Sequence, residues 1–398
     1  MADALHTGLK IGLLTHSVNP RGGVVHTLEL AQALQRDGHD VTMFAPAAPG
    51  QRLFRAPACS FEPVPVAGAP GSVVDMVSER IGAYVAHLAP RLATRPFDIL
   101  HAQDSISANA LAALEDQGLI DGFVRTVHHL DEFDDSRLAA WQARGVQCAR
   151  TVLCVSDLWR DRLADDFGID AQRVNNGVDA ERYSAQPGDG DLILAHRLGI
   201  TEAAGRGPVF LAVGGVEERK NTRRVLEAFA LLKADLPGAQ LVIAGGASLL
   251  DHDGYARAFQ ADLRDSGLTV GYARDVVIAG TLADADMPAL FRLADVLVMA
   301  STCEGFGLVV LEALASGTPV VVSSIAPFTE YLGDTDVSWA DPQDALSIAR
   351  AMRRACDPRR AEVLRYELPA VCRRFSWPAS ARRHADLYRA SLRPPAST

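Results

Sequence analysis

Two glutamates stand out in an apolar stretch of the chain, CEGFGLVVLEALASGTPVVVS, which runs from Cys303 to Ser323. Glu304 precedes a Gly-Phe-Gly turn, and Glu312 lies inside the apolar run that follows. A buried carboxylate is energetically costly unless a hydrogen-bond donor or a cation pairs with it. Either the two glutamates have a purely structural role, or they bind a partner that is not part of the sequence.

The residues around Glu304 predict a strand, a turn and a helix in that order. DVLVMAS is apolar like a buried parallel strand, so Glu304 follows the carboxyl end of that strand. Phe306 lies in the turn, and the helix is predicted to begin near Leu308 and to end at Gly317. Free N–H groups and a positive dipole end make a helix start suitable for phosphate. The backbones of Gly307 and Leu308 are therefore predicted to bind one.

The two carboxylates are then placed to bind sugar hydroxyls. Leu308 and Glu312 are four residues apart and lie on one face of the predicted helix. Glu312, one turn behind the phosphate, can accept two hydrogen bonds from a cis-diol such as a ribose. Glu304, at the strand end, can accept a hydrogen bond from a hydroxyl of a second sugar. The pattern therefore favours a nucleotide sugar as the ligand.

Two further strand ends carry glycine loops that lead into helices. NPRGGVVHT contains Gly22 and Gly23, and GGVEERKNT contains Gly214 and Gly215. Glycine lets a backbone approach a ligand closely, so Gly22, Gly23 and Gly215 are predicted to line a phosphate site. For any one loop, a tight turn required only by the fold is the alternative. The fingerprints GxGxxG and GxxxxGK[ST] are missing from the sequence, which argues against a dinucleotide-binding oxidoreductase and a P-loop enzyme.

Arg219 and Lys220 follow the second of these glycine turns, at the start of a predicted helix. Cations at a helix start oppose the helix dipole. A diphosphate bound at the same point would relieve this conflict, because both cations could then pair with it. We therefore predict that Arg219 and Lys220 hold a diphosphate; a solvated pair of cations is the alternative.

The elements that must position these residues alternate between strands and helices. Apolar runs such as LKIGLLTH, FDILHA, PVFLAVGG and TPVVVSS are separated by helical patterns such as TRRVLEAFALLKADLPG. This alternation predicts an α/β architecture with parallel sheets and right-handed crossovers. A turn-rich break near residues 184–207 divides the chain, so we predict two Rossmann-like, doubly wound domains that face each other across a cleft. Ligands of such sheets bind beyond the carboxyl ends of the strands.

The bulk composition is that of an ordinary globular protein. The chain has 398 residues, 48% of them hydrophobic, and a formal net charge of −10. This acidic balance argues against nucleic acid as a partner. The N-terminus lacks the apolar core of a signal peptide, and no apolar run is long enough to span a membrane, so a cytoplasmic protein is expected. The six cysteines include no CxxC pair and are expected to be free thiols.

Residues 72–95 leave two interpretations open. Apolar positions recur there at helical spacing, and the segment carries Arg80, Arg91 and Arg95. Such a helix could lie on an anionic membrane surface as a peripheral contact and meet a lipid acceptor there. Packing against the sheet of its own domain is the alternative.

Beyond these local arguments, Glu304 and Glu312 form an E-x7-E pattern, and EGFGLVVLEALASGTPVV resembles the signature of the retaining nucleotide-sugar glycosyltransferases of family four. PRGGVVHTLELAQAL, VNNGVDAERY, VGGVEERKNTRRVLEAF and FSWPASARRHADLYRASL resemble further motifs of that family, spread over nearly the whole chain. The resemblance implies the GT-B fold, with residues 1–185 as an acceptor-side domain and residues 186–370 as a nucleotide-sugar domain. Residues 371–398 would then form a helix that returns to the first domain.

The resemblance also implies roles for individual residues. The cations of EERKN would stabilise the leaving diphosphate, and Glu304 would contact the donor sugar near C3. RTVHH matches the family's Thr-x-His strand end, which implies that His128 lies next to the transferred sugar. Many members have Gly-Arg where this chain has Gly214-Gly215, so Arg219 is expected to contact the phosphate there alone. Residues at other strand ends of the first domain could touch the acceptor: His16, Gln103, Asp104, His129 and Asp131.

The resulting prediction is a retaining glycosyltransferase that moves a sugar from a nucleoside diphosphate to an acceptor hydroxyl by front-face transfer, without a metal or another cofactor. A sugar-nucleotide-binding protein or an epimerase of the same fold is the alternative. Four D-x-D triplets occur, and we predict a helix cap in LADADMPAL and loops elsewhere rather than metal ligands. The triplets end at Asp191, Asp253, Asp286 and Asp336.

Overall fold

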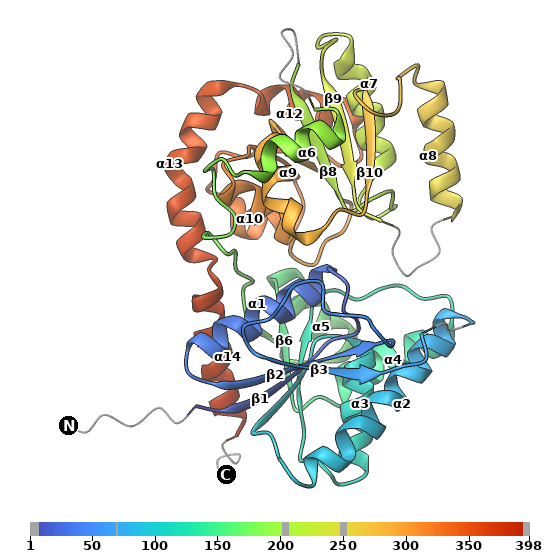
Figure 1. Ribbon diagram of the computed structural model, residues 1–398, viewed down its shortest axis with the longest axis vertical. Helices are drawn as coiled ribbons and strands as arrows, with labels where there is room; N and C mark the ends of the chain where they lie inside the picture. The colour runs from blue at the N-terminus through green and yellow to red at the C-terminus, as the bar shows by residue number, and fades with distance from the viewer. Residues whose placement is uncertain (1–7, 69–70, 201–206, 247–252, 393–398) are drawn as a thin grey trace, which may run out of the picture. The chain divides into compact units, whose positions relative to one another are not determined.

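The computed structural model describes residues 8–68, 71–200, 207–246 and 253–392 (Figure 1). The chain forms two compact units. The first contains the residues up to Gly177 and those from Trp377 onward, and the second contains Val178–Ser376. The sequence-based borders lie after residues 185 and 370. In the structure, Val178 and Ser376 form a parallel bridge, which ties the beginning of the second unit to its end.

A parallel sheet forms the centre of the first unit. Its strands are β1 Lys10–Leu14, β2 Asp40–Ala47, β3 Ser60–Pro65, β4 Ile99–Ala102, β5 Val124–Val127, β6 Thr151–Cys154 and β7 Gln172–Arg173. Within the described residues, the seven strands lie in the order β3-β2-β1-β4-β5-β6-β7. β1, β4 and β5 are almost completely buried, as expected for strands with helices on both faces.

The helices of the first unit are α1 Gly22–Arg36, α2 Val73–Leu92, α3 Ser105–Asp116, α4 Ser136–Gln147, α5 Asp157–Phe167 and α14 Trp377–Ser391. α1 packs against α14 on one face of the sheet, whereas α2, α3 and α4 lie side by side on the other (Figure 1). α14 comes from the far end of the chain. Its buried face carries Trp377, His384 and Tyr388, which places these side chains in the core of the first unit.

A second parallel sheet forms the centre of the second unit. Its strands are β8 Val209–Val213, β9 Gln240–Ala244, β10 Val276–Gly280, β11 Val296–Met299, β12 Val320–Ser323 and β13 Ser338–Ala340. Within the described residues, the order is β10-β9-β8-β11-β12-β13. The strands predicted from LKIGLLTH, FDILHA, PVFLAVGG and TPVVVSS are thus confirmed as β1, β4, β8 and β12.

The helices of the second unit are α6 Gly190–Leu198, α7 Thr222–Lys233, α8 Asp253–Asp265, α9 Met287–Leu293, α10 Leu308–Ala315, α11 Phe328–Leu332, α12 Ala345–Ala355 and α13 Pro358–Arg374, with a short 3-10 turn η1 Asp284–Asp286. α7 packs against α12, and α6 packs against α9 (Figure 1). α10 begins at Leu308, the residue predicted from the sequence. The buried rings of Phe210, Phe229 and Phe259 belong to the core between the sheet and its helices.

The helix predicted from residues 72–95 packs on the sheet of its own unit. α2 buries Met76, Tyr84 and Leu88 against the core of this unit, and a peripheral membrane contact of its outer face stays a prediction. Arg80 donates to the backbone oxygen of His16 at 2.8 Å. Arg91 pairs with Glu62 at 2.6 Å. Two of the three arginines of the segment are therefore engaged inside the unit and do not form a basic outer stripe.

A search of residues 8–68, 71–200, 207–246 and 253–392 finds no helix with the length and apolar character that crossing a membrane requires. All six cysteines are free, as expected from the sequence.

Candidate functional site

Glu304, the first of the two glutamates in the apolar stretch 303–323, lies against two cations. The residue is 6% exposed, just beyond the end of β11. Arg219 donates to Glu304 Oε1 at 2.6 Å, and Lys220 Nζ contacts the same oxygen. The Ser301 hydroxyl lies 3.4 Å from this oxygen as well. The buried carboxylate is therefore compensated inside the protein, and the two predicted diphosphate ligands meet at a single atom.

The loop between β8 and α7 brings the cations to this point. Gly214 has a φ of 126°, and a Cβ there would lie 2.8 Å from Cε of Lys220. The stem of Lys220 thus runs across Gly214, which explains a glycine at this position. Asn221, with a φ of 57°, donates from its amide to Ala300 O at 3.0 Å and Pro342 O at 2.7 Å. These bonds tie the loop to the residues that follow β11 and β13.

Lys220 is largely desolvated. Its side chain is 15% exposed, and burial lowers its pKa, an effect that the neighbouring Glu304 opposes. Arg219 is more open, with 32% of its side chain exposed, and has Glu217 at 3.9 Å as a second carboxylate. An ammonium has three N–H donors, so Lys220 can pair with a further anion in addition to Glu304.

The start of α10 has the geometry predicted for a phosphate-binding turn. Gly307 has a φ of 88°, which a residue with a side chain rarely adopts, and α10 has no side-chain cap. Phe306 is buried, with its ring stacked on Tyr331 at 4.6 Å between centroids. The side chain of Phe306 therefore anchors the turn in the core, and the backbone N–H groups are the parts of this turn that suit an anion.

Glu312 lies on α10 and is 8% exposed. Its charge is close enough to Tyr183 to raise the pKa of that phenol, although burial is the larger cause. Tyr183 ends the VNNGVDAERY segment. The structure thus brings this segment to the glutamate that was predicted to bind ribose.

The predicted glycines of the first unit lie in the first turn of α1. Arg21, at the N-cap position, makes no side-chain cap, so the amides of this turn are open to a ligand. A Cβ built on Gly22 would meet nothing within 4 Å, and one on Gly23 would reach Cδ2 of His128 at 3.5 Å. The fold itself does not require a glycine at residue 22. His128 lies beside this helix start, at the carboxyl end of β5.

The remaining predicted residues of the first unit form two groups. Gln103 Oε1 lies 3.0 Å from His128 Nε2 and belongs to the group beside α1. On the other side, His16 Nδ1 lies 3.9 Å from Asp104 Oδ2, and His129 Nε2 lies 3.2 Å from Asp131. Asp104 also caps α3 through its other oxygen, and Oδ2 is buried without a hydrogen bond.

Two arginines near Asp104, Arg80 and Arg125, were not predicted from the sequence to lie at the candidate site. Arg125 is 3% exposed on β5; its guanidinium donates to Thr126 O, and its Nε is buried without a partner. Burial lowers the pKa of Arg125 to about 10, and the charge of Asp104 opposes this. Burial also lowers the pKa of Arg80, and the charge of Asp104 again opposes this. An arginine inside the apolar strand pattern FVRTV was the available signal.

Three of the D-x-D triplets bind arginines. Asp191 pairs with Arg292 at 2.6 Å, and Asp286 pairs with Arg197 at 2.5 Å; Asp336 contacts Arg360. The predicted helix cap in LADADMPAL is wrong, because Asp286 makes no side-chain cap to α9 and is used in its ion pair. The triplet that ends at Asp253 lies partly outside the described residues. In the part of the chain that the structure describes, no three His, Cys, Asp or Glu residues are grouped as metal ligands would be.

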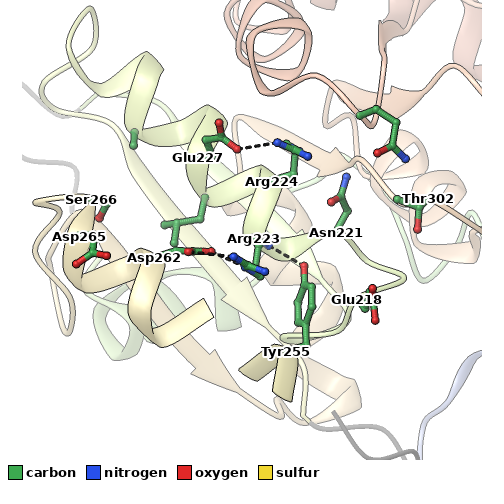
Figure 2. Close-up of a pocket in the computed structure, with 13 residues that line it drawn as sticks. Glu218, Asn221, Arg223, Arg224, Glu227, Tyr255, Asp262, Asp265, Ser266 and Thr302 are labelled. Atoms are coloured by element: carbon green, nitrogen blue, oxygen red, sulfur yellow. Dashed lines mark hydrogen bonds and ion pairs between the residues drawn. The ribbon is translucent and has the colours of Figure 1, made fainter. Parts of the chain in front are cut away.

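A cavity of about 710 Å³ lies on the second unit, lined by residues of α7 and α8 (Figure 2). Arg223 faces Asp262 across it at 2.5 Å, and Arg224 faces Glu227 at 3.0 Å (Figure 2). None of the residues predicted to bind the donor lines this cavity. The donor is therefore not assigned to this cavity.

The match with known families covers both units. Residues 20–182 match the profile of Glycosyltransferase Family 4, and residues 199–366 match that of Glycosyl transferases group 1. The chain belongs to glycosyltransferase family 4 and is a glycosyltransferase. It is 29% identical over 349 residues to the phosphatidyl-myo-inositol mannosyltransferase of Mycolicibacterium smegmatis, covering 84% of this chain and 81% of that protein. It is also 29% identical over 336 residues to a glycogen synthase of Mycobacterium tuberculosis, covering 79% and 73%.

Solved structures of glycosyltransferases share the fold. A sucrose-phosphate synthase from Thermosynechococcus elongatus matches with a TM-score of 0.74 and 20% identity, covering 96% of this chain and 98% of that one. Anabaena HepE, solved with UDP and glucose, matches with a TM-score of 0.74 and 18% identity, covering 96% and 100%. The fold is GT-B, and the fold class predicted from the sequence is confirmed.

The glycines at the two helix starts give a stability prediction. Gly307→Ala should destabilise the second unit by about 1–3 kcal/mol, because of its positive φ and because the new Cβ would lie 2.7 Å from the Phe328 ring. Gly22→Ala should leave the free energy of unfolding almost unchanged, because the added methyl group meets open space. Urea unfolding of both variants measures this. Equal losses of stability in the two variants would contradict the assignment.

Proposed function

We propose that this glycosyltransferase uses a nucleoside-diphosphate sugar as donor, retains the anomeric configuration of the transferred sugar, and needs no metal. The meeting of Arg219 and Lys220 at one oxygen of Glu304 carries the proposal. A diphosphate needs several donors in one place, and this cluster supplies them next to the uncapped start of α10. The nucleotide part of the donor belongs to the second unit in this proposal.

Donor binding changes the partners of the cluster. The diphosphate takes hydrogen bonds from Arg219, Lys220 and the N–H groups of Gly307 and Leu308. Glu304, now sharing its cations, accepts a hydrogen bond from a hydroxyl of the donor sugar. Glu312 accepts hydrogen bonds from the ribose. Each buried carboxylate therefore keeps a partner in both states, which the cost of an unpaired buried charge requires.

In the transfer step, the bond between the anomeric carbon and the diphosphate oxygen breaks while the acceptor oxygen attacks from the same face. The proton of the acceptor hydroxyl goes to a phosphate oxygen of the leaving group. Negative charge grows on the diphosphate as the bond breaks. Lys220 and Arg219 stabilise this charge more strongly in the transition state than in the ground state, which is the condition for catalysis.

The acceptor side is assigned to the first unit. The named relatives act on different molecules, so their names do not identify the acceptor of this chain. His16, Asp104, His129 and Asp131 supply groups that bind hydroxyls. Arg80 and Arg125 add two positive charges without an ion pair to a carboxylate among the described residues. This charge suits an acceptor that carries a phosphate or a carboxylate in addition to its hydroxyl.

Donor binding can be tested before the acceptor is known. Thermal-shift screening with UDP-, GDP- and ADP-sugars should identify a stabilising donor. Glu312→Ala should then weaken binding of that donor roughly 10- to 100-fold, because a charged hydrogen-bond acceptor is lost. The exposed helix residue Glu362 provides the matched control, Glu362→Ala. Unchanged donor affinity of Glu312→Ala in calorimetric titration would exclude the ribose role.

Turnover tests the electrostatic mechanism. Lys220→Ala should lower kcat by ~10²–10³, as for other preorganised charges that stabilise a transition state. Lys220→Arg should recover only part of the rate, because a planar fork does not replace a point charge. EDTA should not change the wild-type rate, and NMR of the product should show the anomeric configuration of the donor. Lys10→Ala, at an exposed lysine, is the control. Inversion of configuration, or a wild type silenced by EDTA, would overturn the mechanism.

The charge of the acceptor can be tested through Arg80. Arg80→Gln should raise KM roughly tenfold for phosphorylated acceptors and leave KM for their neutral counterparts unchanged. Suitable pairs are inositol 1-phosphate with inositol, and glucose 6-phosphate with glucose. Arg95→Gln removes an exposed arginine beyond the same helix and should change neither. Equal effects of Arg80→Gln on charged and neutral acceptors would refute an anionic acceptor.

A further inference from the structure

The hydrogen bond of His128 defines which of its nitrogens carries a proton. His128 Nε2 lies 3.0 Å from Gln103 Oε1, and an amide oxygen can only accept. Nε2 therefore carries the hydrogen, and a neutral imidazole then has a bare Nδ1. Burial, with the nearby His26 and Arg125, lowers the pKa of His128 well below its usual value, so the ring is neutral at ordinary pH. His128 thus presents Nδ1 as an acceptor.

Gln103 is itself held in one orientation. It is 2% exposed, and its amide nitrogen lies 3.2 Å and 3.3 Å from the two ring nitrogens of His101. His101 is fully buried between two hydroxyls. Its Nε2 lies 2.8 Å from Thr126 Oγ1, and its Nδ1 lies 2.7 Å from the Tyr388 hydroxyl. Because both ring nitrogens of His101 have hydroxyl partners, the amide nitrogen of Gln103 packs against the imidazole ring, and its oxygen faces His128.

This network begins on the last helix of the chain. Tyr388 lies on α14, which follows the whole second unit in the sequence. The same helix packs His384 5.8 Å from His101, and Trp377 5.3 Å from His26, between ring centroids. His26 in turn packs edge-on against His128 at 4.6 Å. α14 therefore supports His128 both through hydrogen bonds and through ring contacts.

We propose that Gln103, held by His101 and Tyr388, is a positioning residue that keeps His128 in the tautomer with Nδ1 as acceptor for a hydroxyl of the transferred sugar. The inference rests on the proposed function, in which His128 meets that sugar. In this proposal, α14 contributes to the site of the first unit. Its Tyr388 hydroxyl acts through His101 and Gln103 on which nitrogen of His128 carries no hydrogen. A swing of Gln103 by half a turn would present an N–H donor to Nε2, and the bare nitrogen would be lost to the sugar.

Tyr388→Phe tests the network with the smallest change available. Removing one hydroxyl should lower kcat roughly five- to tenfold, the equivalent of one hydrogen bond, with donor KM and nucleoside-diphosphate affinity nearly unchanged. Rates are measured as donor hydrolysis with the nucleotide sugar that stabilises the protein most. Tyr84→Phe is the matched control: Tyr84 is also fully buried in the first unit, and its hydroxyl bonds backbone oxygens of Thr15 and Phe44. Similar losses of kcat in Tyr388→Phe and Tyr84→Phe would show that the network has only a structural role.

Gln103 offers a second, pH-dependent readout. Gln103→Glu keeps an acceptor for Nε2 but adds a negative charge beside His128, which raises the pKa of the imidazole. Protonated His128 has no bare nitrogen, so this variant should lose activity at neutral pH and regain it as pH rises through the new pKa. Wild type should not show this ionisation. Gln103→Met, which lacks the amide, should be slow at every pH. A Gln103→Glu profile identical in shape to wild type would overturn the proposal.

Imidazole ¹⁵N chemical shifts separate this inference from the proposed function. Wild type should show the single Nε2–H tautomer of His128, and Tyr388→Phe should show a mixture of tautomers, whether or not a donor is present. A single tautomer in both proteins would refute the positioning role. If instead the tautomers behave as expected but wild type binds and cleaves no nucleotide sugar, the network stands as a structural fact and the proposed function fails.

Discussion

The ion cluster of Glu304, Arg219 and Lys220 is the constraint on which the second unit depends. Either component alone would be costly: Glu304 would be a buried, unpaired carboxylate, and the two cations would repel each other at a desolvated loop. Much of the surrounding geometry serves this cluster. Gly214 makes room for the stem of Lys220, and Asn221 fixes the loop to the end of β11. The cluster is thus a preorganised polar site.

Parallel sheets bring the candidate residues of each unit together. The carboxyl ends of neighbouring parallel strands meet at one edge, so side chains far apart in sequence share a short perimeter. In the first unit, β1 is followed by His16, β4 by Gln103 and Asp104, and β5 by His128. The two faces of the sheet then separate the polar residues: Gln103 and His128 lie beside α1 and α14, and His16 contacts Asp104 and Arg80 near α2.

The sequence predicts features that depend on neighbouring residues better than features that depend on contacts between distant parts of the chain. Buried strands such as β8 and β12 are visible as apolar runs, whereas β3, SFEPVP, and the three residues of β13 are too polar or too short to stand out. The motif around Glu304 also predicts the start of α10. In contrast, the pairing of Glu304 with Lys220, the burial of Arg125, and the contact of His101 with Tyr388 arise from tertiary packing, for which no local pattern exists.

The burial of histidines in the first unit has an electrostatic consequence for the proposed reaction. Cleavage of a glycosidic bond to a diphosphate leaves positive charge on the sugar and negative charge on the leaving group. The cations of the second unit suit the leaving group, but a charged imidazole beside the sugar would oppose the reaction. His26, His101 and His384 are buried around His128 and, like it, have a lowered pKa because of desolvation. A neutral ring can accept a hydroxyl hydrogen bond without adding charge. In the proposed reaction, the apolar surroundings of these histidines would therefore favour the same transition state as the cation Arg219.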